Sequence, residues 1–466
     1  MTAADALQSP TADRAGRIFP LHLTPFEEYM LWDDRPEYPM TFVVQLDLEG
    51  EIDREALTET LPLALERHPL LQAIVGPAKG NRDCWITAPN PQVMIDWADW
   101  EVPVGIPNGE AINLRKQVGL RIWVRTKQQR SMLTLQFHHA AADGIGAYQF
   151  IGDWLWYYAE RVGQPVTQPL PPNDAKALRR RGKASYSLDN YRLPNGQLEV
   201  DKREAFTYAL KSMLPVAAPR RADPQRNQST ECSERFPGLC GYEFDKATYK
   251  QLRHVAEARG QSANELLIER LLVSLRAWNK EQGKDKKGTF CIMMPMDLRE
   301  ADTRMGTAAN LVTYALVRRD REECMESEQL IDSLRQEMVR LKHQRHRTPF
   351  MNMMAYLTRY PSWLKRWYAG RGCAATAILS NTGDPTKRFT VPLPSEKGIV
   401  RAGNLRLLDI SGVPPMRNGT HLTISIFTYR RVLKICLRCD PHRFTVAQSQ
   451  QFLDHYTSMI HRLLDA

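Results

Sequence analysis

The stretch that decides the fold is Ser131–Gly144, SMLTLQFHHAAADG, in which an alternating run ends at two adjacent histidines. Every second residue from Leu133 to Phe137 is apolar, which is the period-two pattern of a β-strand. Because neighbouring side chains of a strand point to opposite faces, His138 and His139 are not expected to serve one site together. Residues 145–161 have the length and the apolar content of a helix that could anchor the loop. The stretch therefore predicts a strand, a loop that presents one imidazole, and a helix.

The composition of this loop favours an enzyme site without a metal. Three alanines at 140–142 leave room for a substrate, and Gly144 allows a close backbone approach. A zinc site is the alternative interpretation of two histidines and an aspartate. However, zinc-binding helices carry H-E-x-x-H, with histidines four residues apart, whereas these are adjacent in an extended segment. The sequence also lacks the G-x-S-x-G motif of serine hydrolases, so we predict no metal and no serine nucleophile.

The motif His-His-x-x-x-Asp-Gly in this setting resembles that of the chloramphenicol acetyltransferase-like superfamily of acyltransferases. This superfamily includes peptide-synthetase condensation domains, wax ester synthases and Pap-type polyketide acyltransferases. The resemblance covers nearly the whole chain, because further segments similar to family landmarks follow in the family's order: Leu23–Glu28, Glu66–Leu71, Pro295–Arg299, Asn310 and Ser380–Gly383. The Asp-Phe-Gly-Trp-Gly signature of the plant BAHD branch is absent, so that branch is not expected and the subfamily stays open.

The resemblance implies an α/β fold (an α+β sandwich) of two chloramphenicol acetyltransferase-like lobes. Mixed sheets flanked by helices form each lobe, and an active-site tunnel runs between them. The implied catalytic residue is His139, as a general base. The implied structural residues at the site are His138, Asp143, Gly144 and Arg299, with Asp143 paired to Arg299, and the candidate oxyanion donors or channel residues are Ser380, Asn381 and Thr382. A Ser-Asn-Thr-Gly run is also typical of an ordinary turn.

The expected activity is transfer of an acyl group from a thioester to a hydroxyl or amine acceptor. An unperturbed imidazole titrates near pH ~6.5, so a neutral His139 can accept the acceptor's proton and return it to the departing thiolate. No bound cofactor is expected, because acyl-CoA or a phosphopantetheine-linked acyl group on a carrier protein is a substrate. We expect a free-standing enzyme and favour coenzyme A as the donor. The alternative is a non-catalytic, condensation-like binding or scaffold protein that docks a carrier protein.

Composition and charge fit this expectation. The chain has 466 residues, 43% hydrophobic and 25% charged, enough for a large core and two or three domains. Its net charge of +10 would attract an anionic partner, such as a phosphate-bearing donor. Nucleic acid is not favoured, because neither zinc-finger spacing nor a basic-aromatic RNA-binding signature occurs. The tract Arg179–Lys183 is interpreted as a solvated loop, with a contact to donor phosphates as the alternative.

A cytoplasmic location is expected, because no secretory signal and no apolar run of about 18 residues occurs. The eight cysteines are scattered, and the closest pair, Cys436 and Cys439, is predicted to lie on opposite faces of one strand. We expect reduced cysteines rather than a redox or metal pair.

The pattern along the chain predicts an N-terminal lobe at 1–175, an inter-lobe crossover at 176–240 and a C-terminal lobe at 241–466. The strands are predicted at 41–48, 131–137, 242–244, 290–294, 312–317, 422–429 and 432–437, and the helices after Asp53, at 145–161, at 245–260, after the capping box Ser262–Glu265, and at 446–464. Phe350–Tyr368, rich in methionine and aromatic residues, is interpreted as a core or inter-lobe helix. Its alternatives are a methionine-lined acyl channel or a peripheral contact with an anionic membrane.

Overall fold

The computed structural model describes most of the chain between residues 18 and 465. The residues outside this description are 1–17, 78–82, 107–108, 165–167, 174, 182–215, 221–235, 284–287, 300–305, 344–349, 351–352, 354–374 and 466. The predicted crossover and Phe350–Tyr368 therefore lie largely outside the described residues. The two described residues of the latter, Phe350 and Met353, are fully buried in the core.

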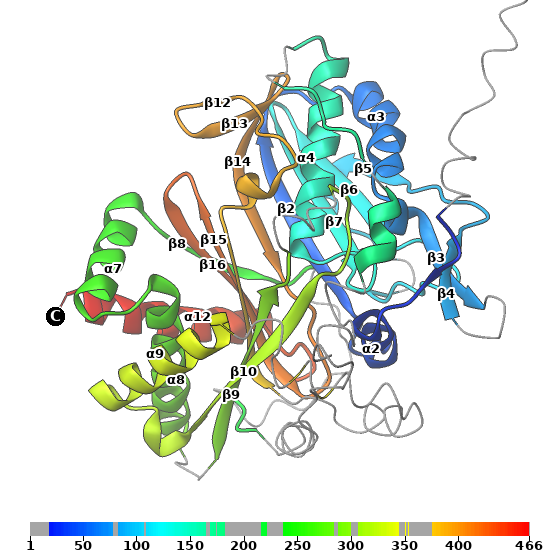
Figure 1. Cartoon of the computed structure of the whole chain (residues 1–466). Coiled ribbons are helices and arrows are strands. Elements are labelled where there is room, and N and C mark those ends of the chain that lie inside the picture. Colours follow the sequence, from blue (N-terminus) through cyan, green and yellow to red (C-terminus); the bar gives the residue numbers. More distant parts are fainter. Residues whose placement is uncertain are drawn as a thin grey trace, which may run out of the picture.

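The N-terminal lobe is built on a seven-stranded sheet with the order β12-β13-β14-β2-β7-β6-β5. Its strands are β2 (Thr41–Glu49), β5 (Ile95–Asp99), β6 (Leu120–Lys127), β7 (Arg130–His138), β12 (Ser395–Glu396), β13 (Ile399–Ala402) and β14 (Leu405–Val413). Helices α3 (Arg54–Glu66) and α4 (Gly144–Arg161) cover it (Figure 1). The strands predicted from alternation at 41–48 and 131–137 and the helix predicted at 145–161 are confirmed.

Three strands of this sheet come from late in the chain. β14 pairs antiparallel with β2 from Arg406–Glu49 to Val413–Val43, and β13 and β12 extend the sheet beyond it (Figure 1). This differs from the expectation that all of 241–466 lies in the C-terminal lobe. Local periodicity does not predict that these three strands join the N-terminal sheet, because a strand's pattern shows which face is buried but not which sheet the strand joins.

The C-terminal lobe contains a six-stranded sheet with the order β10-β9-β11-β15-β16-β8. Its strands are β8 (Cys240–Phe244), β9 (Thr289–Asp297), β10 (Val312–Asp320), β11 (Ala375–Gly383), β15 (Thr420–Tyr429) and β16 (Val432–Cys439), and its helices are α7 (Lys246–Ala258), α8 (Ala263–Glu281), α9 (Glu328–His343) and α12 (Val446–Leu464). The predicted start signals are confirmed: Asp245 caps α7, and Ser262 and Glu265 form a reciprocal capping box on α8. The helices pack on one face of the sheet and form a separate core there.

Outside the two large sheets, the described strands form one three-stranded sheet. Helix α2 (Pro25–Asp33) follows β1 (Leu21–His22), which pairs with β4 (Asp83–Thr87), and β4 pairs with β3 (Ala73–Pro77). No helix among the described residues is both long and apolar enough to cross a membrane.

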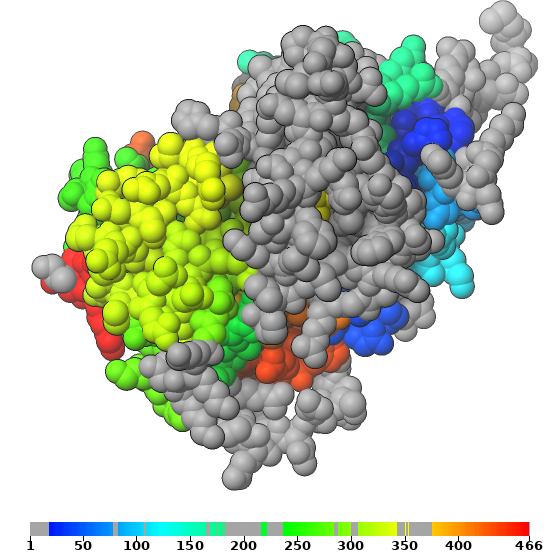
Figure 2. All heavy atoms as spheres, turned by 60° about the horizontal axis from the view of Figure 1, so that its bottom comes forward, coloured from blue at the N-terminus to red at the C-terminus, as the bar shows by residue number. Residues whose placement is uncertain are grey.

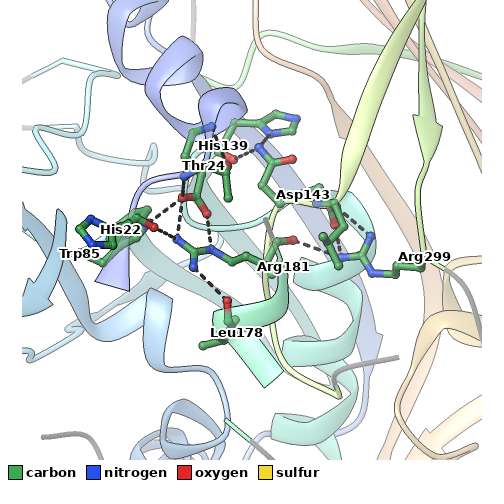
Figure 3. Close-up of polar contacts among 12 residues, drawn as sticks. His22, Thr24, Trp85, His139, Asp143, Leu178, Arg181 and Arg299 are labelled. Carbon is green, nitrogen blue, oxygen red and sulfur yellow. Dashed lines mark hydrogen bonds and ion pairs between the residues drawn. The ribbon is translucent and has the colours of Figure 1, made fainter. Parts of the chain in front are cut away.

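The interpretation of Arg179–Lys183 as a solvated loop is wrong for Arg181. Its guanidinium is buried and donates to both carboxylate oxygens of Glu27, at 2.7 and 2.8 Å, and to the carbonyl of His22 (Figure 3). Trp85 donates to the same carboxylate. Arg179 is exposed, and 182–183 lie outside the described residues.

Cys436 and Cys439 lie on opposite faces of β16, as the odd spacing predicts. Cys436 belongs to the core shared with the N-terminal lobe, and Cys439 belongs to the core beneath the C-terminal helices. Both thiols are free, and burial raises the pKa of Cys436 to about 11. Neither has the environment of a reactive thiolate.

Candidate active site

The motif loop begins where β7 ends. His138 is the last residue of β7, and the backbone N–H of His139 donates to the carbonyl of Met40 at 2.8 Å. The chain then turns through three residues, and Asp143 caps α4 by accepting from the N–H of Gly146 at 2.8 Å. A strand end and a capped helix therefore hold the loop on both sides.

The two histidines have different surroundings, as alternation along the strand predicts. His138 is fully buried, its Nδ1 accepts from the N–H of Ala140 at 3.1 Å, and its Nε2 lies 3.4 Å from Asp34. His139 is only partly buried and lines a cavity between the two lobes. The structure thus gives His138 local bonds within the loop and leaves His139 facing open space.

The imidazole of His139 is oriented by its own backbone and by Asn310. The Asn310 amide donates to the carbonyl of His139 at 2.8 Å, and its nitrogen lies 3.4 Å from Nδ1 (Figure 3). The ring also bonds that same carbonyl. Asn310 and the backbone thereby hold the ring in place where His139 lines the cavity.

Burial sets the protonation state of His139. Removal from water disfavours the charged ring and lowers the pKa of His139 to about 4, although the carboxylate of Asp143 and the bond to the backbone carbonyl act in the opposite direction. The imidazole is therefore neutral at pH 7. A neutral ring with a free nitrogen can accept a proton.

Asp143 and Arg299 form the ion pair that the resemblance implies. The guanidinium donates to both carboxylate oxygens, at 2.8 and 2.9 Å, and both side chains are buried (Figure 3). Asp143 also accepts from the N–H of Leu311 at 2.8 Å, and Arg299 also donates to the carbonyl of Ala309. Burial alone would lower the pKa of Arg299, but the neighbouring carboxylates raise it. The pair joins the motif loop to the segment that carries Asn310.

A histidine from the helix end at Glu66–Leu71 holds the same segment. His68 is fully buried, and its Nδ1 accepts from the N–H of Ala308 at 2.8 Å. Its Nε2 lies 3.3 Å from Asp153 of α4. Desolvation lowers the pKa of His68, although the Asp153 carboxylate opposes this. The residues before Asn310 are thus fixed from the N-terminal lobe.

Two expectations about the small residues of the loop are wrong. The alanines at 140–142 have no exposed surface and pack in the core, so they leave no room for a substrate. The close backbone approach occurs at Gly146, where a Cβ would lie 3.0 Å from the backbone of Ala309. A Cβ on Gly144 would meet nothing nearer than 4.0 Å. Gly144 instead lies in the wall of the cavity.

The cavity that His139 faces has a volume of about 130 Å³ and lies between the two sheets. Its N-terminal wall includes Phe42 of β2 and the start of α4, and its C-terminal wall includes Ser380 and Thr382 of β11. Asn381 also reaches the cavity, but its amide donates to Asn264 at 3.1 Å. The structure therefore brings all three candidate oxyanion residues to the cavity of His139, with Asn381 already engaged.

Sequence reasoning missed several polar residues of this cavity, among them Tyr148 and Arg388. Tyr148 lies one turn into α4, is bonded to the Thr382 side chain, and keeps its proton because burial raises its pKa. Arg388, at the end of the short helix Pro385–Arg388, is exposed and lines the same cavity. No pattern distinguishes this tyrosine from the other aromatic residues of an apolar helix. Among the described residues, no group of three or more His, Cys, Asp or Glu could hold a metal ion.

The comparisons with known proteins rest on structure. No family model matches the sequence, and no curated protein matches it. The first condensation domain of the calcium-dependent antibiotic synthetase, in complex with a substrate analogue, superposes with a TM-score of 0.66 at 14% identity, over 95% of this chain and 96% of that one. SgcC5 from Streptomyces globisporus superposes with a TM-score of 0.62 at 18% identity, over 95% of this chain and 98% of that one. Polyketide synthase associated protein 5 from Mycobacterium tuberculosis superposes with a TM-score of 0.60 at 17% identity, over 95% of this chain and 98% of that one.

These similarities show the fold. The chain has the two-lobed architecture of condensation domains and related proteins over nearly its full length, which confirms the predicted fold class. An epimerization domain of tyrocidine synthetase B and an X-domain from teicoplanin biosynthesis also match. Because proteins with such different names share the fold, the reaction has to be argued from the site.

Proposed function

We propose that this protein transfers an acyl group from a thioester to a hydroxyl or amine acceptor, with His139 as the general base. The observation that carries the proposal is a neutral imidazole that lines a cavity between two lobes, with Asn310 bonded to the backbone carbonyl of the same residue. This arrangement suits a proton acceptor that must keep one orientation.

The proposed reaction needs no covalent enzyme intermediate. His139 takes the proton of the acceptor's O–H or N–H as the acceptor's oxygen or nitrogen forms a bond to the thioester carbonyl carbon. The carbonyl oxygen becomes an oxyanion in a tetrahedral intermediate. When the carbon–sulfur bond breaks, the leaving thiolate takes the proton from the imidazolium, so the free histidine is regenerated.

The oxyanion requires hydrogen-bond donors in the cavity. Ser380, Thr382 and Tyr148 bring hydroxyl groups to the walls of the cavity of His139. The phenol of Tyr148 stays protonated, because burial raises its pKa. Ser380 is the donor we favour, since the amide of Asn381 already donates to Asn264, the hydroxyl of Thr382 donates to the carbonyl of Ile426, and the phenol of Tyr148 is bonded to Thr382.

The donor is proposed to be acyl-CoA or an acyl group on a carrier protein. The net charge of +10 favours an anionic donor. The similarity to a condensation domain of an antibiotic synthetase and to a polyketide synthase associated protein supports a thioester carried by a phosphopantetheine arm. Arg388 is an exposed cation in the cavity wall and is a candidate contact for that donor.

Single-turnover mixing with an acyl-CoA panel and mixed alcohol and amine acceptors tests the proposal, with thiol release and product mass as readouts. A general base contributes about 10²–10⁴-fold to the rate, so His139→Ala should lose that factor. His254→Ala, at an exposed position of α7, is the matched control and should react like the parent. Full activity of His139→Ala would contradict the proposal. Binding of the thioester without release by the parent would instead support the scaffold alternative.

A further inference from the structure

A second cavity, of about 330 Å³, lies in the C-terminal lobe between its sheet and helix α9. Six of its ten lining residues are apolar: Met294, Pro295, Met296, Met338, Leu341 and Leu379. Met294 and Leu379 belong to the core beneath the C-terminal helices, whereas their neighbours Met293 and Ile378 belong to the core shared with the N-terminal lobe. The second cavity is therefore on the opposite face of the sheet from His139.

The two cavities meet where strands β9 and β11 separate. Both strands continue to Asp297 and Gly383, but their parallel pairing consists of Ile292 with Ala377 and Met293 with Ile378. Pro295 lies two residues beyond Met293 and has no N–H to donate to a ladder. Pro295, Asp297 and Asn381 line both cavities. The paired part of β9 and β11 thus ends just before the residues that the two cavities share, and the cavities adjoin one another there.

The chemistry of the second cavity suits a hydrocarbon chain. Methionine side chains are flexible and adapt to apolar ligands of varied shape. The charged side chains in the lining lie at its ends: Asp297 toward His139, and the exposed Lys342, 3.7 Å from Glu265, at the outside. The two amide side chains in the lining, Asn264 and Asn381, are bonded to each other, so the amides of a pantetheine arm would find few partners there, whereas the apolar residues gain by burying methylene groups.

We infer that this cavity is the subsite for the acyl chain of the donor, with the chain passing between β9 and β11 from the carbonyl held at His139. The inference rests on the proposed function and names its donor class: a thioester of a medium-length, unbranched acyl chain. A water molecule takes about 30 Å³ and a methylene group is of similar size, so 330 Å³ accommodates at most about eleven carbons.

Two variants at one position test the inference in opposite directions. Met338 is buried on the inner side of α9, while its neighbour Val339 is exposed on the outer side, which is yellow at the surface in Figure 2. Met338→Trp fills the cavity, Met338→Ala enlarges it, and Val339→Trp is the matched control. The measurement is kcat/KM for acyl-CoA substrates with 2 to 12 carbons, with thermal melts to check folding.

For the parent, kcat/KM should rise about fourfold per added methylene until the cavity is full. Met338→Trp should lower the ratio of octanoyl to acetyl turnover at least about tenfold and leave acetyl turnover unchanged, because the blocked volume corresponds to two or more methylenes. Met338→Ala should shift the optimum to longer chains. Misfolding would lower kcat/KM by the same factor for every acyl chain length. An unchanged chain-length profile in both variants would overturn the inference while leaving the proposed function intact.

Direct binding separates the two proposals. An S-octyl thioether of pantetheine, which cannot react, should bind His139→Ala as it binds the parent and should bind Met338→Trp at least about tenfold more weakly in calorimetry. If no thioester reacts but this difference in binding holds, the proposed function fails and the chain subsite stands. Equal affinity for Met338→Trp and the parent would contradict the subsite itself.

Discussion

Removal of Arg299 should destabilise the protein strongly. In the structure its guanidinium makes two bonds to the buried carboxylate of Asp143, and nothing else among the described residues neutralises that charge at bonding distance. Arg299→Ala would leave the carboxylate buried with only the N–H groups of Gly146 and Leu311. Breaking a buried pair in this way costs about 3–5 kcal/mol of the free energy of unfolding.

An exposed pair of the same geometry provides the control. Arg115 also donates through two nitrogens to Asp83, but both side chains are largely in solvent, with exposed fractions of 57% and 38%. Arg115→Ala should therefore cost only about 0–1 kcal/mol. Arg299→Lys keeps the charge without the two-pronged geometry and should fall between the two alanine variants.

Equilibrium urea unfolding, followed by fluorescence of the ten tryptophans and checked for reversibility, measures these differences. A double-mutant cycle with Asp143→Ala should give an interaction energy of about 2–3 kcal/mol. If Arg299→Ala unfolds with the same free energy as Arg115→Ala, the ion pair does not hold the loop and the reasoning is refuted.

Three further predictions follow from the same contacts. Because the pKa of His139 is lowered to about 4, the acid limb of kcat/KM should lie near pH 4 rather than 6.5. The unfolded chain binds this proton at a higher pH than the folded chain, so the contribution of His139 to stability should be complete above about pH 6.5 and be lost as the pH falls toward 4. Urea titrations at several pH values should show this slope, and His139→Gln should reduce it. Gly146→Ala should destabilise by about 1–3 kcal/mol, since its Cβ would meet backbone at 3.0 Å, whereas Gly144→Ala should melt like the parent; equal melting of the two would contradict the packing. Glu27→Gln should weaken the network around buried Arg181 by about 2–4 kcal/mol in urea, and a loss below 0.5 kcal/mol would show that the network is not needed.

Local patterns predicted strands β2, β7, β8, β9, β10, β15 and β16 and helices α3, α4, α7, α8 and α12, because each element's periodicity or cap is written in adjacent residues. The other described strands and helices α2 and α9 were not predicted. Asp53, Asp245 and Ser262 each begin the helix that the capping signals predict. The attachment of β14 to β2 was not predictable in this way. It depends on which strand edge is open in the assembled molecule, and that is a property of the whole chain.

The candidate site was predicted in part. The pairing of Asp143 with Arg299 came from the resemblance, since no local rule relates residues 156 positions apart. The small side chains at 140–142 led us to expect space for a substrate, but in the structure these alanines are packed within the hydrophobic core. Tyr148 and the cavity at Met338 were missed, because an aromatic or methionine on a helix face has the same pattern whether it meets the core or a void.

The late strands have a consequence for how the polypeptide is assembled during translation. Until residues 405–413 leave the ribosome, β2 has an open edge beside a largely complete N-terminal sheet. Such an edge is a template for pairing with another chain. A nascent fragment that ends before residue 395 should therefore self-associate in sedimentation experiments, and adding a synthetic peptide of residues 395–413 should suppress that association. Splitting this gene between its lobes would yield two incomplete products.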